Sequence, residues 1–535
     1  MKKIILILTL LFLVTIEAQQ RPKLVVGIVV DQMKMEYLYR FSDDFSANGF
    51  KRLMKNGYTF HNMHYNYMPT YTGPGHASIY TGTTPATHGI IANEWFNKAS
   101  GNELYCTEDG SVKTIGDGTK SEGEMSPKNL QSSTITDELR LATNFKGKVI
   151  GISLKDRAAI LPAGHFANWA FWHSKTGAFI SSSFYGEALP DWVTKFNQEK
   201  RYLPYLSKGW DFFKSPTIYN ESLPDDNPYE GKLNGVKSFF PYDLKAIYDK
   251  NQANFVRETP FGNDFLAEFA VRAIEKEGLG KDTITDFLTI SFSSPDYVGH
   301  IFGTRSIEVQ DTYLRLDQTI ADFLIYLDNA IGTENYLIFL TADHGGAENS
   351  SHLSDNKYAV KNSQPKEIRK ALKQYSLDTF GEDLVLNYSN FNLYFNKEVI
   401  KNKGLELNKV KQSFKDFLMT QEQVKKVYTE EEIWSATNND YFLSCIAKGY
   451  DSKQNGDLVI LDKPGYIQYG ATGTSHGTPY SYDTHVPLLF YGWKIKQGES
   501  FNKKVITQIA PTLSQILKIP FSNGTEAEVL EEVLR

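Results

Sequence analysis

Five short apolar runs, rich in valine, isoleucine and leucine, most strongly limit the folds open to this chain. They are KLVVGIVV (23–30), KVIGISL (148–154), DFLTISF (286–292), YLIFLT (336–341) and VPLLFY (486–491). Continuous apolar runs of this length are typical of strands buried on both faces of a sheet. Helical patterns alternate with them, at 263–277 and 312–331. The alternation predicts an α/β fold with a mostly parallel central sheet and helices on both faces.

Polar side chains follow four of these runs at their carboxyl ends. In chain order they are Asp31, then Lys155 and Arg157, then Asp296, then Asp343 and His344. In sheets of this kind, ligands bind beyond the carboxyl ends of the strands. We therefore expect these residues to meet at one site.

Six carboxylate and imidazole side chains form a candidate set of metal ligands. They are Asp31, Asp296, His300, Asp343, His344 and His476. Asp296 and His300 are four residues apart, so on one helix they face the same way. His485, just before the last apolar run, is an alternative to His476 as the third nitrogen ligand. Zinc accepts both carboxylate oxygen and imidazole nitrogen, so the set predicts two Zn²⁺ ions per chain. Paired metal ions are a standard device for phosphoryl transfer.

The segment PTYTGPGHASIYTG (69–82) carries the candidate nucleophile, Thr72. Glycine and proline around this threonine predict a tight entry into a helix, with Pro74 near its first position. Thr72 then lies at a helix N-terminus, where free N–H groups favour a phosphate. A threonine hydroxyl becomes an effective nucleophile when a bound metal ionises it.

Three further side chains are candidates for holding phosphate oxygens. Lys155 and Arg157 are cations one residue apart, so along an extended segment they point the same way. An ammonium and a bidentate guanidinium suit a dianionic phosphate. The side-chain amide of Asn93, in GIIANEWF (89–96), can donate an N–H to a third oxygen.

The first twenty residues have the pattern of a secretory signal peptide. Lys2 and Lys3 precede an apolar stretch at 4–16, which ends in small and polar residues at 17–20. A membrane anchor is the alternative, but the stretch is shorter than the about 20 residues that a bilayer span requires. We expect a periplasmic or secreted protein without a stable membrane anchor.

The rest of the sequence predicts one large domain. Length alone favours about three domains, but candidate ligands from position 31 to position 476 have to meet at one point. We expect a single catalytic domain at 21–535, with an aromatic-rich cap inserted at about 163–260 and a small α+β insertion at about 356–462.

Charge and cysteine content exclude some classes of partner and site. The net charge of −6 is evenly mixed along the chain, so there is no concentrated basic face for nucleic acid. Cys106 and Cys445 are the only cysteines. They either form a disulfide or are two small buried side chains, and we favour the second interpretation.

Taken together, these segments resemble the alkaline phosphatase superfamily. The segments 69–96, SSPDYVGHIFG (293–303), TADHGG (341–346) and TSHGTPYSYDTHVPLLFYG (474–492) are similar to the nucleophile and ligand segments of its type I phosphodiesterase/nucleotide pyrophosphatase branch. The resemblance implies that Asp31, Asp343 and His344 bind one zinc together with Thr72. It implies that Asp296, His300 and His476 bind the other, and that Asn93 binds phosphate.

Lys155 and Arg157 point to one type within this superfamily. They resemble the cation pair with which exported alkaline phosphatases stabilise the charge of a monoester, a pair that the diesterase members lack. The resemblance implies an alkaline phosphatase that hydrolyses small phosphate monoesters broadly through a phospho-threonine intermediate, and we expect it to be a monomer. A nucleotide pyrophosphatase/phosphodiesterase acting on phosphodiesters is the alternative. A non-catalytic protein that kept the fold is a third hypothesis.

Overall fold

The structure is a computed structural model that describes residues 21–248, 253–437 and 439–534. The predicted signal peptide at 1–20 lies outside these residues. Within the described ranges, no helix combines the length and the apolar character that a membrane crossing requires.

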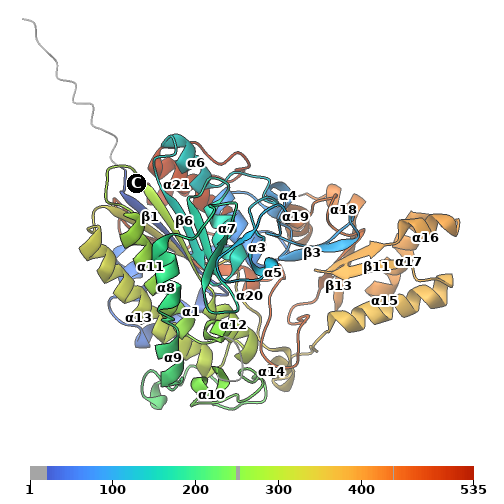
Figure 1. The fold of residues 1–535 in the computed structure, drawn as a ribbon. Helices are drawn as coiled ribbons and strands as arrows, with labels where there is room; N and C mark the ends of the chain where they lie inside the picture. The colour runs from blue at the N-terminus through green and yellow to red at the C-terminus, as the bar shows by residue number, and fades with distance from the viewer. Residues whose placement is uncertain (1–20, 249–252, 438, 535) are drawn as a thin grey trace, which may run out of the picture.

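An eleven-stranded sheet runs through the molecule (Figure 1). At its centre, five parallel strands lie side by side: β10 (Tyr336–Thr341), β1 (Leu24–Val30), β9 (Asp286–Phe292), β6 (Val149–Ser153) and β7 (Trp169–His173). Beyond β10 lie β15 (His485–Gly492), β2 (Tyr58–His64), β16 (Gly498–Ser500) and β17 (Lys504–Val505), and beyond β7 lie β8 (Phe179–Ser182) and β5 (Thr114–Ile115). Because β15 and β8 pair antiparallel with their neighbours, the sheet is mixed, with a parallel centre.

The five apolar runs form five of these strands, which confirms the predicted fold class. All residues of β1, β9 and β10 are buried, because helices cover both faces of the sheet. Figure 1 shows α11 (Phe261–Glu277), α13 (Ile307–Ala330) and α8 (Asp191–Gln198) on one face. On the other face lie α3 (Thr72–Thr81), α7 (Asp156–Ala163), α6 (Ile135–Ala142) and α21 (Ile509–Leu517). Helix α13 begins earlier than predicted, since the Ser306 hydroxyl accepts a hydrogen bond from the Val309 N–H and caps the helix there.

The segment predicted as a cap, 163–260, belongs in part to the main sheet. Its strands β7 and β8 extend the sheet beyond β6. The aromatic residues that favoured a cap instead fill the core, where the rings of Phe171 and Phe179 lie 5.5 and 3.8 Å from that of Phe269 on α11. The rest of the segment carries α8, α9 (Leu203–Lys208) and α10 (Leu244–Tyr248).

A second, four-stranded antiparallel sheet lies beside the main one (Figure 1). Its strands are β11 (Val385–Ser389), β12 (Asn392–Phe395), β14 (Leu458–Asp462) and β13 (Val424–Thr429), and α15 (Pro365–Phe380) and α17 (Leu407–Met419) share its apolar core. Helix α17 ends at Met419, and the chain enters β13 at Val424, where the register with β14 shifts between Val424 and Lys426.

Candidate active site

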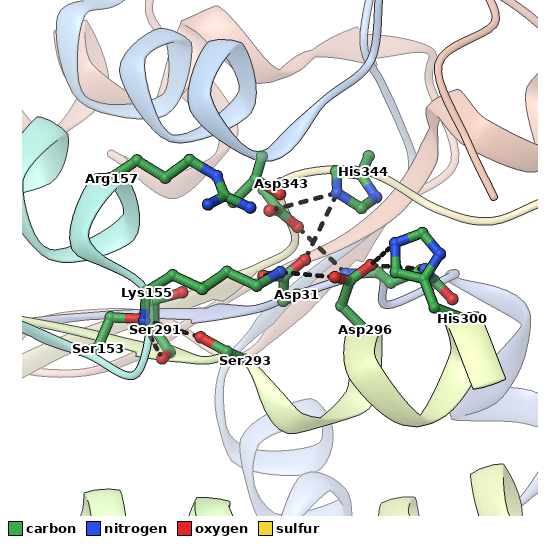
Figure 2. A network of polar contacts seen from close by, with 12 residues as sticks. Asp31, Ser153, Lys155, Arg157, Ser291, Ser293, Asp296, His300, Asp343 and His344 are labelled. Carbon is green, nitrogen blue, oxygen red and sulfur yellow. Dashed lines mark hydrogen bonds and ion pairs between the residues drawn. The ribbon is translucent and has the colours of Figure 1, made fainter. Parts of the chain in front are cut away.

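The carboxyl ends of three adjacent parallel strands bring four predicted ligands together. Strand β1 pairs with β9 on one side and with β10 on the other. Asp31 follows β1, Asp343 and His344 follow β10, and Asp296 lies in the first turn of α12 (Ser294–Phe302) after β9. All four side chains are buried, and Figure 2 shows them converging.

Asp31, Asp343 and His344 form a first compact group. Their ligand atoms lie within 4.8 Å of one another. His344 Nε2 is 3.5 Å from Asp31 Oδ1 and 3.5 Å from Asp343 Oδ2. All three atoms are buried, and among the described residues none of them has a hydrogen-bond partner. Buried acceptors in this state are costly, and a divalent cation is the partner that two carboxylates and an imidazole fit.

The three predicted histidine ligands share one orientation. The Nδ1 atom of His300, His344 and His476 lies 2.7, 2.9 and 2.7 Å from the backbone oxygens of Thr474, Gly345 and Thr70 respectively. An Nδ1–H that donates to a carbonyl leaves the lone pair on Nε2. Backbone carbonyls orient many metal-binding histidines in this way.

Asp296, His344 and His476 form a second compact group, again with ligand atoms within 4.8 Å. The rings of His344 and His476 stack with centroids 3.4 Å apart, so His344 contributes to both groups. His300 also reaches the second group, because its Nε2 lies 3.1 Å from Asp296 Oδ1, one helical turn away. The structure therefore brings all six predicted ligands to one place, with His344 between the two groups.

Lys155 links the two groups. Its Nζ lies 2.6 Å from Asp31 Oδ2 and 2.5 Å from Asp296 Oδ2, and Figure 2 shows it between these carboxylates. Burial lowers the pKa of Lys155, but the charges of Asp296 and Asp31 raise it by more, so the net pKa lies above its usual value and the ammonium stays charged.

The buried carboxylates differ in their electrostatic environment. Burial, followed by the charge of Asp296, raises the pKa of Asp31 to about 6. Burial and then Asp31 raise the pKa of Asp343 well above its usual value. Burial opposes ionisation of Asp296 as well, but His300 and Lys155 hold its pKa well below the usual range. Mutual repulsion among these acids favours the binding of cations between them.

Thr72 is the first residue of α3, as the sequence predicts, and is buried. The Gly73 N–H donates to Asn93 Oδ1 at 2.7 Å, which fixes the Asn93 amide beside the helix N-terminus. Gly75 allows close contact with the metal-ligand loop, since a Cβ there would lie 2.3 Å from the Asp343 carbonyl oxygen. The N-terminus of α3, which carries Thr72, thus lies against Asn93 through Gly73 and against the loop that carries Asp343 through Gly75.

Arg157 projects beside Lys155 toward the carboxylates (Figure 2). The local backbone differs from the extended segment assumed in the sequence interpretation, because α7 begins at Asp156 and Lys155 is its N-cap. Arg157 Nη1 donates to the Tyr105 hydroxyl at 2.9 Å, and that hydroxyl donates to Asp156 Oδ1 at 2.6 Å. This chain of contacts orients the guanidinium.

Three supporting residues were not predicted from the sequence. Gln32 Nε2 donates to Asp296 Oδ1 at 2.6 Å. His76 joins the Thr72 carbonyl to Ser291 Oγ, with both contacts at 2.8 Å. Tyr105 is the third. The position of Gln32 directly after Asp31, and of His76 one helical turn after Thr72, were the available signals.

Two alternatives from the sequence are resolved. His485 lies away from both ligand groups, with Nε2 bound to the His61 carbonyl at 2.8 Å and its ring against His64, so His476 is the histidine at the site. Cys106 and Cys445 are buried and free, so they are two small interior side chains rather than a disulfide.

Comparison with known proteins agrees with this geometry. Residues 25–485 match the family model described as type I phosphodiesterase / nucleotide pyrophosphatase. The chain belongs to this family. Within it, the chain is 44% identical over 525 residues to alkaline phosphatase PafA of Elizabethkingia meningoseptica, covering 97% of the chain and 95% of that relative. It is also 44% identical over 525 residues to a Myroides odoratus protein named calcium-transporting ATPase, covering 97% and 96%.

The fold of this family member matches a solved structure closely. The crystal structure of wild-type alkaline phosphatase PafA superimposes with a TM-score of 0.93 at 43% identity, covering 96% of the chain and 99% of that structure. The match confirms the alkaline phosphatase-like fold and the predicted resemblance. The roles of the individual site residues remain predictions.

Proposed function

We propose that this chain is an exported alkaline phosphatase that hydrolyses phosphate monoesters broadly at a site holding two Zn²⁺ ions. The observation that carries the proposal is the pair Lys155 and Arg157, which project together toward two carboxylate–imidazole groups. A monoester dianion offers three non-bridging oxygens and two negative charges, whereas a diester offers one charge. Two fixed cations therefore favour the monoester. The name of the PafA relative, similar over nearly the whole chain, supports the same activity.

The ligand atoms fit two metal ions. Asp31, Asp343 and His344, with Thr72, would hold one ion, and the unpartnered oxygens and nitrogen of this group support that assignment. Asp296, His300 and His476 would hold the other. When bound, the two ions would favour ionisation of the attacking hydroxyl and offset charge on the leaving oxygen.

The reaction would proceed in two displacements. The Thr72 hydroxyl gives its proton to solvent and its oxygen attacks phosphorus, the bond to the ester oxygen breaks, and the leaving alkoxide takes a proton from solvent. Water then loses a proton as it attacks the phospho-threonine, the P–O bond to Thr72 breaks, the Thr72 oxygen regains a proton, and phosphate is released. Asn93, Lys155 and Arg157 hold the non-bridging oxygens through both steps.

The test compares kcat/KM of the zinc-loaded protein on an aryl phosphate monoester and on its methyl diester. We expect a strong monoester preference and a phosphorylated peptide containing Thr72 after acid quench. Thr72→Ala should abolish both the turnover and the labelled peptide. A diester preference would favour the phosphodiesterase alternative, and activity of Thr72→Ala would reject the nucleophile. ATP belongs in the same panel because of the name of the Myroides relative.

We also propose that residues 21–535 form one monomeric catalytic domain, released after cleavage of residues 1–20. Its insertions are the part of 163–260 that follows β8 and the segment at about 356–462. Two measurements on protein purified from cells that express the full chain test this. The N-terminal sequence of the exported protein should begin near residue 21. Light scattering of the purified protein should give the mass of one chain.

A further inference from the structure

A cavity of about 460 Å³ borders the candidate site at Lys155 and Arg157. Its walls come from α5 (Lys120–Gly123), the end of β7, η3 (Ala253–Glu258) and Tyr297 of α12. It reaches solvent at the exposed Lys120 and Lys175 and ends at the buried Lys155. None of the proposed metal ligands lines it, so it is an additional space beside the site.

Two polar side chains in the cavity wall have buried atoms without partners. Arg257 Nε is buried without a hydrogen bond, and within the described residues no carboxylate lies within the 4.0 Å of an ion pair with Arg257. His173 is only 5% exposed, and within the described residues its ring nitrogens make no hydrogen bond of normal geometry, although the Gly177 carbonyl lies close enough to raise its pKa. Burial lowers the pKa of His173 to about 3 overall, so the ring is neutral. An unpartnered buried donor such as Arg257 Nε calls for a ligand.

Four acidic side chains line the cavity, at Glu108, Glu122, Glu124 and Asp156. Glu108 is exposed and accepts the Tyr105 N–H at 3.4 Å, and Glu124 lies 4.0 Å from the exposed Lys120. The Glu122 carboxylate accepts backbone N–H groups of Thr119 and Lys175 at 2.9 and 2.6 Å. Asp156 accepts the Tyr105 hydroxyl. Lys175, like Arg257, makes no ion pair within 4.0 Å in the part of the chain that the structure describes. At the inner end of the cavity, around Arg257 and Lys155, the side chains that keep free hydrogen-bonding capacity are therefore cationic donors, which favours an anion there.

Tyr297 connects the cavity to the phosphate site. Its ring centroid lies 4.9 Å from Lys155 Nζ and 4.8 Å from Arg257 Cζ. Because both distances end at the same centroid, the two cations are at most 9.7 Å apart. A phosphoryl group held by Lys155 can thus be joined to a second anionic group at Arg257 by a short linker. Met125 and Trp172 provide apolar wall along the way.

We propose that this cavity binds a second anionic group of the substrate, so that the enzyme prefers monoesters whose alcohol carries another phosphate. Arg257 is the principal ligand of that group, with Lys175 at the entrance. The inference rests on the proposed phosphomonoesterase function and names the substrate class that the site favours.

The test uses α,ω-alkanediol bisphosphates of three to six carbons, each paired with the n-alkyl phosphate of the same length. Release of phosphate gives kcat/KM, and the bisphosphate value is halved because it has two reactive ends. We expect a preference for the bisphosphate of about 10-fold or more at one chain length, equivalent to about 1.4 kcal/mol. We expect Arg257→Gln to reduce this ratio to about 1, and high salt to reduce it in the wild type.

Controls separate this proposal from a general loss of activity. The ratio is measured within each variant, so an overall change in turnover cancels. Arg201→Gln removes a cation that pairs with Glu268 outside the cavity and should keep the wild-type ratio. Lys175→Gln, at an exposed position, should lower the ratio without affecting folding. A wild-type ratio near 1, or a ratio that survives Arg257→Gln, would overturn the proposal. Failure to hydrolyse even the alkyl phosphates would instead reject the proposed function.

Discussion

Lys155→Met removes one positive charge from between two buried carboxylates while keeping most of the side-chain volume. The ammonium contacts Asp31 and Asp296 at 2.6 and 2.5 Å, and its side chain is only 3% exposed. Removing one partner of a buried ion pair costs about 3–5 kcal/mol, because the remaining charge stays unbalanced in the interior. In chelator-treated protein, we therefore expect the free energy of unfolding to fall by about this amount.

Metal ions would change that result. Bound divalent cations would balance the same carboxylates, so in zinc-loaded protein we expect Lys155→Met to cost only about 1 kcal/mol, an ordinary value for a point substitution. Urea unfolding followed by tryptophan fluorescence, with chelator and with excess zinc, measures both values. The test rests on the difference between the two costs in unfolding free energy, with chelator and with zinc, because the substitution itself is the same in both conditions.

Lys411→Met is the matched control. Lys411 is also buried and pairs with Glu431 at 3.3 Å, but it lies on α17 beside the second sheet. Its cost should be the same with and without zinc. Equal costs of Lys155→Met in the two conditions, or a cost below about 1 kcal/mol in chelator, would refute the argument that Lys155 balances the metal-ligand carboxylates.

Three further predictions follow from single contacts. Gly75→Ala places a Cβ 2.3 Å from the Asp343 carbonyl oxygen and should lower the free energy of unfolding by about 1–3 kcal/mol in urea unfolding. Gly110→Ala is the control and should be neutral, because a Cβ there meets no described atom within 4 Å. Similar costs for both substitutions would contradict the steric argument. Gln32→Leu removes the donor 2.6 Å from Asp296 Oδ1 and should weaken metal binding about 10–100-fold in chelator competition, so unchanged affinity would count against its role. Tyr105→Phe removes the hydroxyl between Arg157 and Asp156. It should lower kcat/KM for monoesters about 10-fold, or about 1.4 kcal/mol, with little effect on kcat/KM for diesters. Equal losses on both substrates would show that Tyr105 does not act through Arg157.

The sequence predicted the parts of the site that depend on local patterns. Asp31, Asp296 and Asp343 could be placed together because each follows an apolar strand, and parallel strands present their carboxyl ends at one edge. His476 could not be placed by pattern, since a loop histidine gains its position only from the Thr70 carbonyl that holds its ring. Its identification over His485 rested on the family resemblance.

The parts that failed depend on tertiary packing. Strand β7 was assigned to a cap because its sequence is aromatic, and only its pairing with β6 and its contact with α11 show that those rings belong to the core. The same limit applies to Arg257. Nothing in the sequence around it indicates that its guanidinium lies over Tyr297, which comes from an element 40 residues later.

The pairing of β1 also has a consequence for how the protein is made. Leu24 pairs with Asp286 on one side and with Tyr336 on the other, so β1 stays without both neighbours until more than 300 further residues have been synthesised. Folding of such long-range parallel pairings is slow, and the waiting strand is prone to aggregation. No nascent chain shorter than 476 residues contains all six proposed ligands. Synthesis order thus delays a complete metal site until His476 has been made, and a chain held unfolded for export would assemble that site only at its destination.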